Sequence, residues 1–122
     1  MNRVVIAEDE ALLVDVLTEV FEDEGFEVTA FTTADAAWSH LQAQSNPPDL
    51  LFTDVKMPGR MDGLALASAF ATQWPEVPIV ICSGHAQEPD ERSKRALFLP
   101  KPWSFDHLTE LCRNVKGSAG RV

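Results

Sequence analysis

Val4-Val5-Ile6-Ala7-Glu8-Asp9, near the start of the chain, is a run of four apolar residues that ends on two carboxylates. Three later segments have the same form, a short apolar run followed by one polar residue: Leu50 to Thr53 before Asp54, Ile79 to Cys82 before Ser83, and Leu97 to Pro100 before Lys101. Short apolar runs of this kind are typical of buried strands. The carboxyl ends of parallel strands lie along one edge of a sheet, where open α/β sheets bind ligands. The sequence therefore predicts that three carboxylates, a hydroxyl and an ammonium share one crevice.

Helical patterns alternate with these strands. Strands are expected over residues 3–7, 27–31, 50–53, 77–82 and 97–99. Between them, apolar residues recur at helical spacing, Gly25 closes the first helix, and Thr32 or Thr33 caps the second. The third helix is expected over 63–74, and the inner face of the last helix is expected to comprise Phe105, Leu108, Leu111, Cys112 and Val115. The alternation predicts an α/β fold with a parallel sheet covered on both faces.

Composition narrows the functional classes. A chain of 122 residues with 45% hydrophobic residues is expected to form one domain with a single core. Its net charge of −9 argues against direct binding to nucleic acid or anionic membranes, which would repel it. Apolar runs fall far short of the ~20 residues that cross a bilayer, and no signal peptide precedes the first strand. We expect a cytoplasmic protein in which Cys82 and Cys112 are reduced, buried thiols.

Five segments, in order and each at the end of an expected strand, carry a family resemblance. They are Val4 to Glu10, Asp54 to Gly59, Met61 to Gly63, Pro78 to Gly84 and Phe98 to Pro102. With them the chain resembles a receiver domain of the two-component response regulators. The resemblance implies a flavodoxin-like, doubly wound, five-stranded parallel sheet in the order 2-1-3-4-5. We expect a bacterial signalling protein without an output domain, with the receiver over residues 1–116 and a flexible tail over 117–122.

The resemblance assigns roles to the residues at the strand ends. Asp54 is the implied phosphoacceptor, receiving its phosphoryl group from a sensor histidine kinase or a histidine phosphotransfer protein. Glu8, Asp9, Asp54 and the Lys56 backbone carbonyl would hold Mg²⁺, with Mn²⁺ as an alternative, because hard cations prefer oxygen ligands. Lys101 and Ser83 would bind the phosphoryl oxygens.

Further roles follow from the same resemblance. Ser83 and Phe98 are the implied switch residues, the aromatic ring turning inward when the hydroxyl moves toward the phosphoryl group. Lys56 and His85 flank the acceptor, where family members tune the lifetime of the phosphoryl group. On the first helix, Ala11, Leu12 and Val14 lie off the buried stripe, so we expect them to form a docking patch for the phosphodonor.

Two departures from the family pattern stand out. Arg60 lengthens the loop after Asp54 by one residue. The chain between Ser83 and Lys101 is shorter than usual by about one helical turn (~4 residues), and residues 85–95 lack an apolar stripe. We therefore expect the fourth helix of the fold to be short or disordered, and no dimer through it. The resemblance also implies a cis peptide between Lys101 and Pro102, which X-Pro bonds adopt at lower cost than other peptide bonds.

Other functions fit the sequence less well. A receiver from a hybrid kinase or a multidomain regulator is one alternative, and a Mg²⁺-dependent aspartyl-phosphate phosphatase is another. The phosphatases of the haloacid dehalogenase type need a second aspartate two residues after the nucleophile, where this chain has Lys56. A flavin carrier is disfavoured because no glycine-rich phosphate loop is visible. We therefore expect a phosphoacceptor, which could also dephosphorylate itself, rather than a turnover enzyme, and its downstream protein target stays unassigned.

Overall fold

A computed structural model describes residues 2–83, 96–101 and 103–119 of the chain. Strands and helices alternate through its first part, and two strands and a helix complete it: β1 (Asn2–Ala7), α1 (Ala11–Asp23), β2 (Phe26–Phe31), α2 (Ala34–Ala43), β3 (Leu50–Asp54), α3 (Gly63–Gln73), β4 (Ile79–Ser83), β5 (Ala96–Pro100) and α4 (Phe105–Ala119). All strand pairs are parallel, and the sheet order is β2-β1-β3-β4-β5. The predicted fold class and strand order are confirmed.

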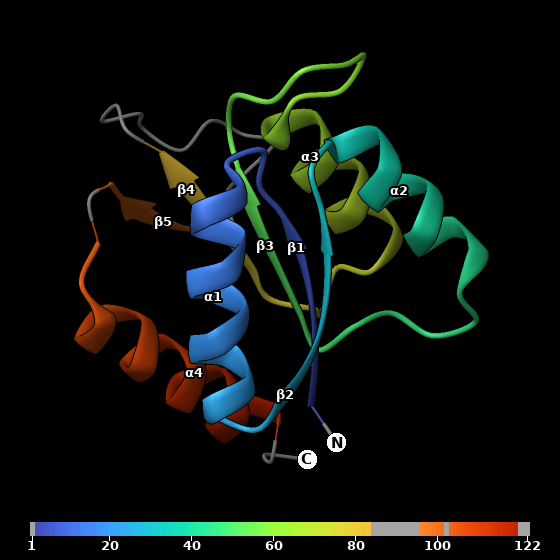
Figure 1. The fold of residues 1–122 in the computed structure, drawn as a ribbon. Coiled ribbons are helices and arrows are strands. Elements are labelled where there is room, and N and C mark those ends of the chain that lie inside the picture. Colours follow the sequence, from blue (N-terminus) through green and yellow to red (C-terminus); the bar gives the residue numbers. More distant parts are fainter. Residues whose placement is uncertain (1, 84–95, 102, 120–122) are drawn as a thin grey trace.

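Two helices cover each face of the sheet (Figure 1). On one face α1 and α4 pack over a core that includes Phe21, Phe52 and Leu108. On the other face α2 and α3 pack over a core that includes Leu41, Leu66 and Phe70. Because β3 lies between helices on both faces, all five of its residues are buried, and its sequence is a continuous apolar run up to Thr53 and Asp54.

Local signals in the sequence set the helix ends. The Thr33 hydroxyl accepts a hydrogen bond from the backbone N–H of Ala36 at 3.1 Å, and the Asp62 carboxylate accepts one from Ala65 at 2.8 Å. Each side chain satisfies a donor that the first turn of a helix leaves free. Gly25 follows α1 with φ = 90°, a conformation that glycine adopts without strain. The expected cap at Thr33 and the stop at Gly25 are confirmed.

The register of the sheet aligns the strand ends. Ala7, the last residue of β1, lies opposite Thr53 on β3, and Asp54 lies opposite Cys82 on β4. Ser83 at the end of β4 lies opposite Pro100 at the end of β5. The residues that follow or end these strands are therefore brought to the same edge, as the sequence predicts.

The last helix differs from its expected form at both ends. Leu108, Cys112 and Val115 are buried as predicted, but Phe105 is 62% exposed, so its assignment to the inner face was wrong. Phe105 opens α4, and the buried stripe begins one turn later, where the helix packs against the core. The backbone of α4 is helical through Ala119, three residues past the domain boundary expected at 116. Residues 85–95, where a short helix was expected, lie outside the described residues.

Candidate functional site

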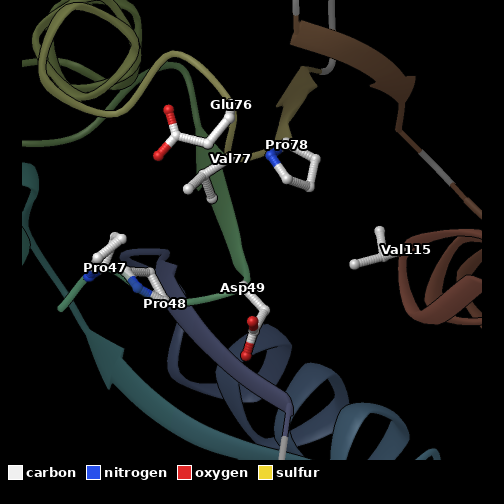
Figure 2. A pocket seen from close by; sticks show the side chains of 7 residues that line it. All are labelled: Pro47, Pro48, Asp49, Glu76, Val77, Pro78 and Val115. Carbon is white, nitrogen blue, oxygen red and sulfur yellow. The ribbon is translucent and has the colours of Figure 1, made fainter. Parts of the chain in front are cut away.

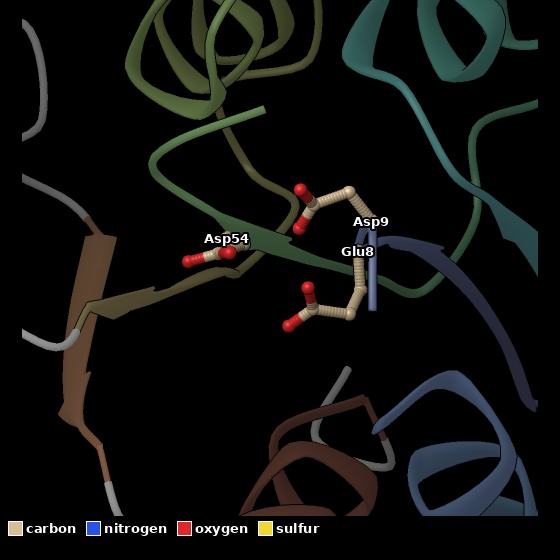
Figure 3. Close-up of side chains that lie close together, drawn as sticks. All are labelled: Glu8, Asp9 and Asp54. Atoms are coloured by element: carbon tan, nitrogen blue, oxygen red, sulfur yellow. The ribbon is translucent and has the colours of Figure 1, made fainter. Parts of the chain in front are cut away.

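Three carboxylates meet at the carboxyl edge of the sheet (Figure 3). Glu8 and Asp9 directly follow β1, and Asp54 ends β3. One oxygen from each of the three carboxylates lies within 4.8 Å of the others. Glu8 is only 1% exposed and Asp54 8%, whereas Asp9 is open to solvent. The cluster is therefore buried on the side of Glu8 and Asp54 and open to solvent at Asp9. Carboxylate oxygens are hard ligands of the kind that Mg²⁺ prefers.

Lys101 supplies the positive charge at this cluster. Its Nζ lies 3.2 Å from Glu8 Oε1 and 3.3 Å from Asp54 Oδ2, so one ammonium contacts carboxylates from two strands. The lysine follows β5, one of the two edge strands, and its side chain is 21% exposed. It bridges the two carboxylates that the fold buries most deeply. The predicted grouping of Glu8, Asp9, Asp54 and Lys101 is therefore what the structure shows.

Burial and charge shift the protonation of this cluster. Burial raises the pKa of Glu8 to about 7, and the neighbouring Asp54 charge adds to the increase, while the Glu10 backbone N–H and Lys101 oppose it. Burial alone would lower the pKa of Lys101, but its contacts with Glu8 and Asp54 raise the pKa above its ordinary value. Lys101 therefore stays charged at neutral pH, whereas Glu8 holds a proton for part of the time.

The backbone around Asp54 is fixed on several sides. The Val55 N–H donates to Asp54 Oδ1 at 2.8 Å, which orients the carboxylate. The Thr53 hydroxyl donates to the Asp54 carbonyl at 2.9 Å, and the Gly63 N–H donates to the Val55 carbonyl at 2.8 Å. Asp54 is thus tied to its own strand and, through Val55, to the start of α3. The other carboxylate oxygen, Asp54 Oδ2, contacts the Lys101 ammonium.

The other residues predicted for the site are placed with less detail. Ser83 ends β4 at the same edge, and Phe98 on β5 is half-buried against the core under α2 and α3. Lys56 is exposed in the loop after β3. His85 and the peptide bond between Lys101 and Pro102 lie outside the described residues. The structure therefore brings the strand ends together and leaves the roles of these residues as proposals.

The predicted docking patch lies beside the cluster. Ala11 is exposed, Leu12 is 80% exposed, and Val14 is half-buried. A hollow of about 350 Å³ is lined by Glu10 and Leu13, which neighbour these residues in sequence, and by Lys101 and Trp103. The start of α1 and Lys101 of the charged site therefore line one hollow.

Some contributors were not predicted from the sequence. The sequence pattern assigns Thr53 only to a strand, although its hydroxyl donates a hydrogen bond to the Asp54 carbonyl. Asp35 was not singled out, although its carboxylate contacts the loop that follows Asp54. The signal for Thr53 was a polar residue inside a run that is otherwise apolar. No sequence pattern links Asp35 to a loop 25 residues away.

A separate hollow of about 300 Å³ lies at the amino ends of β3 and β4 (Figure 2). It is lined by Pro47, Pro48, Asp49, Glu76, Val77, Pro78 and Val115. The Asp49 carboxylate is engaged there by the Arg3 backbone N–H at 2.7 Å. This contact joins the chain before β3 to β1, so the hollow is a junction of loops at the edge opposite to the carboxylates.

Comparison with known proteins identifies the family. The chain matches the model of the response regulator receiver domain over residues 4–113, and it belongs to that family. The receiver protein CpdR of Brucella abortus is 33% identical over 120 residues, with 95% of both chains covered. The transcriptional regulatory protein PdtaR of Mycobacterium tuberculosis is 38% identical over 111 residues.

Some relatives are longer than this chain. The match covers 88% of this chain but 53% of PdtaR, and 24% of the nitrogen assimilation regulatory protein NtrX of Azorhizobium caulinodans, which is 33% identical. Among solved structures, the response regulator TrrA of Thermotoga maritima, in complex with Mg²⁺ and BeF, is 25% identical with a TM-score of 0.83. That match covers 94% of this chain and 99% of TrrA. Within the described residues, no helix has the length and apolar character needed to span a membrane.

Proposed function

We propose that this receiver accepts a phosphoryl group on Asp54 in a Mg²⁺-dependent reaction and signals through protein contacts. The donor is a sensor histidine kinase or a histidine phosphotransfer protein. The observation that carries the proposal is the convergence of Glu8, Asp9 and Asp54 within 4.8 Å, with Lys101 in contact with two of them. The Mg²⁺ and BeF bound to TrrA support the same chemistry.

The reaction is a transfer from nitrogen to oxygen. A carboxylate oxygen of Asp54 attacks the phosphorus of a donor phosphohistidine, the phosphorus–nitrogen bond breaks, and the imidazole leaves with that electron pair and takes up a proton. The product is an acyl phosphate on Asp54. Alignment and charge neutralisation supply most of the catalysis in such transfers, because the carboxylate itself is a weak nucleophile.

Different residues of the site would orient Asp54, bind Mg²⁺ and neutralise the phosphoryl oxygens. The Val55 N–H holds Asp54 Oδ1, which leaves Oδ2 for attack. Glu8, Asp9, Asp54 and the Lys56 carbonyl are the ligands that would hold Mg²⁺, which neutralises charge on the transferred oxygens when bound. Lys101 contacts Oδ2 before the reaction and moves to a phosphoryl oxygen after it.

Residues around this centre have proposed roles in signalling. Ser83 would donate a hydrogen bond to the phosphoryl group, and Phe98 would turn inward when it does, which shifts a two-state equilibrium. Lys56 and His85 flank the acceptor and would set the lifetime of the acyl phosphate. Ala11, Leu12 and Val14 would contact the phosphodonor.

The test is the intact mass of the protein after incubation with acetyl phosphate and Mg²⁺. We expect the mass to increase by one phosphoryl group, and we expect no increase for Asp54→Asn or in the presence of a chelator. Asp62→Asn is a matched control, because it removes a carboxylate near the site but keeps an oxygen that can cap α3. An unmodified wild-type protein that is folded and supplied with Mg²⁺ would refute the proposal.

A further inference from the structure

The loop between β3 and α3, residues 55–62, is held in place by a residue of a different element. This loop begins directly after Asp54 and carries Lys56 and Arg60. Asp35, in the first turn of α2, reaches it across 25 positions of sequence. The loop is thus fixed from outside as well as at its two ends.

The contact is a carboxylate on backbone donors. Asp35 Oδ2 accepts a hydrogen bond from the Arg60 N–H at 2.9 Å and a longer one from the Met61 N–H at 3.4 Å. Hydrogen bonds from backbone N–H groups to an ionised carboxylate are stronger than those between neutral partners. One oxygen therefore holds two consecutive peptide units, those of Arg60 and Met61.

The backbone of the loop is shaped for this approach. Gly59, the residue before Arg60, has φ = 115°, a conformation that disfavours any residue with a side chain. A Cβ atom at position 59 would also overlap Asp35 Oδ2. Because Gly59 has no side chain, the loop backbone can approach the Asp35 carboxylate closely enough for the Arg60 N–H to donate to it.

We infer that Asp35 is a positioning residue for the phosphoacceptor loop, one that holds residues 55–62 ready for the cation beside Asp54. The inference rests on the proposed function, because it concerns the binding of Mg²⁺ by Asp54 and the Lys56 carbonyl. A loop that is ordered only on binding loses conformational entropy at that step, which weakens affinity. A loop that Asp35 already fixes avoids this cost.

The inference predicts a change in Mg²⁺ affinity. In Asp35→Ala we expect the dissociation constant for Mg²⁺, measured by isothermal titration calorimetry, to rise about tenfold, within the range for groups that orient ligands. The rate of phosphorylation by acetyl phosphate should approach the wild-type rate at saturating Mg²⁺. The Arg60 and Met61 amides should exchange hydrogen faster in this variant, as followed by NMR.

Two further variants separate positioning from folding. Asp35→Asn keeps an oxygen that accepts from both amides, so we expect its Mg²⁺ affinity to stay within about twofold of the wild type. Thr33→Ala removes the cap of the same helix and no contact to the loop, so it should destabilise α2 without weakening Mg²⁺ binding.

The outcomes are distinct. Wild-type affinity in Asp35→Ala would overturn the inference and leave the proposed function intact, provided that the wild type binds Mg²⁺ and becomes phosphorylated. Equal loss of Mg²⁺ affinity in Thr33→Ala would also overturn it, because the effect would then come from the helix. A wild-type protein that neither binds Mg²⁺ nor takes up phosphate would refute the proposed function, and the inference with it.

Discussion

Gly63 lies directly against the backbone of Asp54. A Cβ atom at position 63 would overlap the Asp54 carbonyl oxygen and approach Thr53 Oγ1 to 3.0 Å. The same glycine donates its N–H to the Val55 carbonyl at 2.8 Å. The start of α3 is therefore packed against the carboxyl end of β3 through its main chain, at a distance that only a residue without a side chain permits.

The first prediction is that Gly63→Ala destabilises the fold and disturbs the acceptor. Relieving the overlap would require a shift of α3 or of the end of β3, and we expect a loss of about 2 kcal/mol or more in the free energy of unfolding. Urea unfolding measures this loss. Phosphorylation by acetyl phosphate should slow as well, because the Asp54 backbone must move.

A control variant on the same helix tests whether the close contact with Asp54, rather than a general loss of stability in α3, slows phosphorylation. Ala69→Gly lowers helix propensity in the middle of α3 and should cost about 1 kcal/mol without slowing phosphorylation. Because alanine favours helices more than glycine does, a Gly63→Ala protein as stable as the wild type would mean that the close contact with Asp54 is readily relieved.

The second prediction is that removal of the Lys101 ammonium strengthens Mg²⁺ binding but slows phosphorylation. Lys101→Ala removes the ammonium that lies 3.2 Å from Glu8 and 3.3 Å from Asp54. We expect Mg²⁺ to bind a few-fold more tightly, since a repelling charge is lost, and phosphorylation to slow about 100-fold, since a charge that stabilises the transition state is lost. Calorimetry and intact-mass kinetics measure the two effects.

Arg113→Ala is the matched control for net charge. Arg113 is 72% exposed and contacts Glu24 at 3.4 Å, on the side of α1 and α4. Its removal changes the net charge by the same amount but should leave both measurements within about twofold of the wild type, because solvent screens distant charges. If Lys101→Ala weakened Mg²⁺ binding, the ammonium would be organising the carboxylates rather than competing with the cation.

The grouping of Glu8, Asp54 and Lys101 could be predicted because it depends on a simple rule. Parallel strands end at one edge, so polar residues after apolar runs meet there whatever the details of packing. The difference in burial between Glu8 and Asp9 could not be predicted from this rule. Consecutive residues point in different directions after a strand, and only the structure shows that Glu8 is buried while Asp9 is exposed.

Contacts between elements distant in sequence escaped prediction for a related reason. Periodicity placed Phe105 on the inner stripe of the last helix, but periodicity alone does not say where along a helix the neighbouring core begins. Asp35 has the composition of an ordinary first-turn residue, favoured there by the helix dipole. Its contact with Arg60 depends on how α2 and the β3–α3 loop lie against each other, which no local pattern encodes.

The third prediction is a pH dependence of the metal-free protein. The pKa of Glu8 is raised from 4.5 to about 7 in the fold, so the folded state binds this proton more tightly than the unfolded state. The contribution of Glu8 to stability is therefore fully present below pH 4.5 and is lost as the pH rises through 7. The loss amounts to roughly 3 kcal/mol.

Glu8→Gln isolates this contribution. The amide does not titrate, so the difference in unfolding free energy between wild type and variant, measured in a chelator, should change between about pH 5 and pH 8. The wild type should lose stability relative to the variant as the pH rises. A difference that is constant with pH would show that Glu8 keeps an ordinary pKa beside Lys101.

The raised pKa of Glu8 also affects the binding of Mg²⁺. Mg²⁺ should bind the wild type less tightly as the pH falls below about 7, because a proton then competes with the cation for Glu8.

The fourth prediction concerns the phosphodonor. Leu12 is 80% exposed at the start of α1, and the next residue, Leu13, lines a hollow together with Lys101 and Trp103. Leu12→Asp should slow transfer from the donor about tenfold, because a charge would then be buried in an apolar contact. The donor would first be found by screening purified histidine kinases and phosphotransfer proteins for transfer to the wild type. Phosphorylation by acetyl phosphate, which needs no docking, should keep its rate.

Leu97→Asp is the control for this change. Leu97 is also an exposed leucine, at 58%, but it lies on β5 opposite Val80, toward the amino end of the strand and away from the carboxylates. Both substitutions place an aspartate on the surface, so both should change the free energy of unfolding by about 0.5 kcal/mol or less. A donor that docks on α1 should discriminate between the two variants. Equal transfer rates for Leu12→Asp and wild type would exclude this patch, and equal slowing by both variants would mean that added negative charge alone repels the donor, since the protein already carries a net charge of −9.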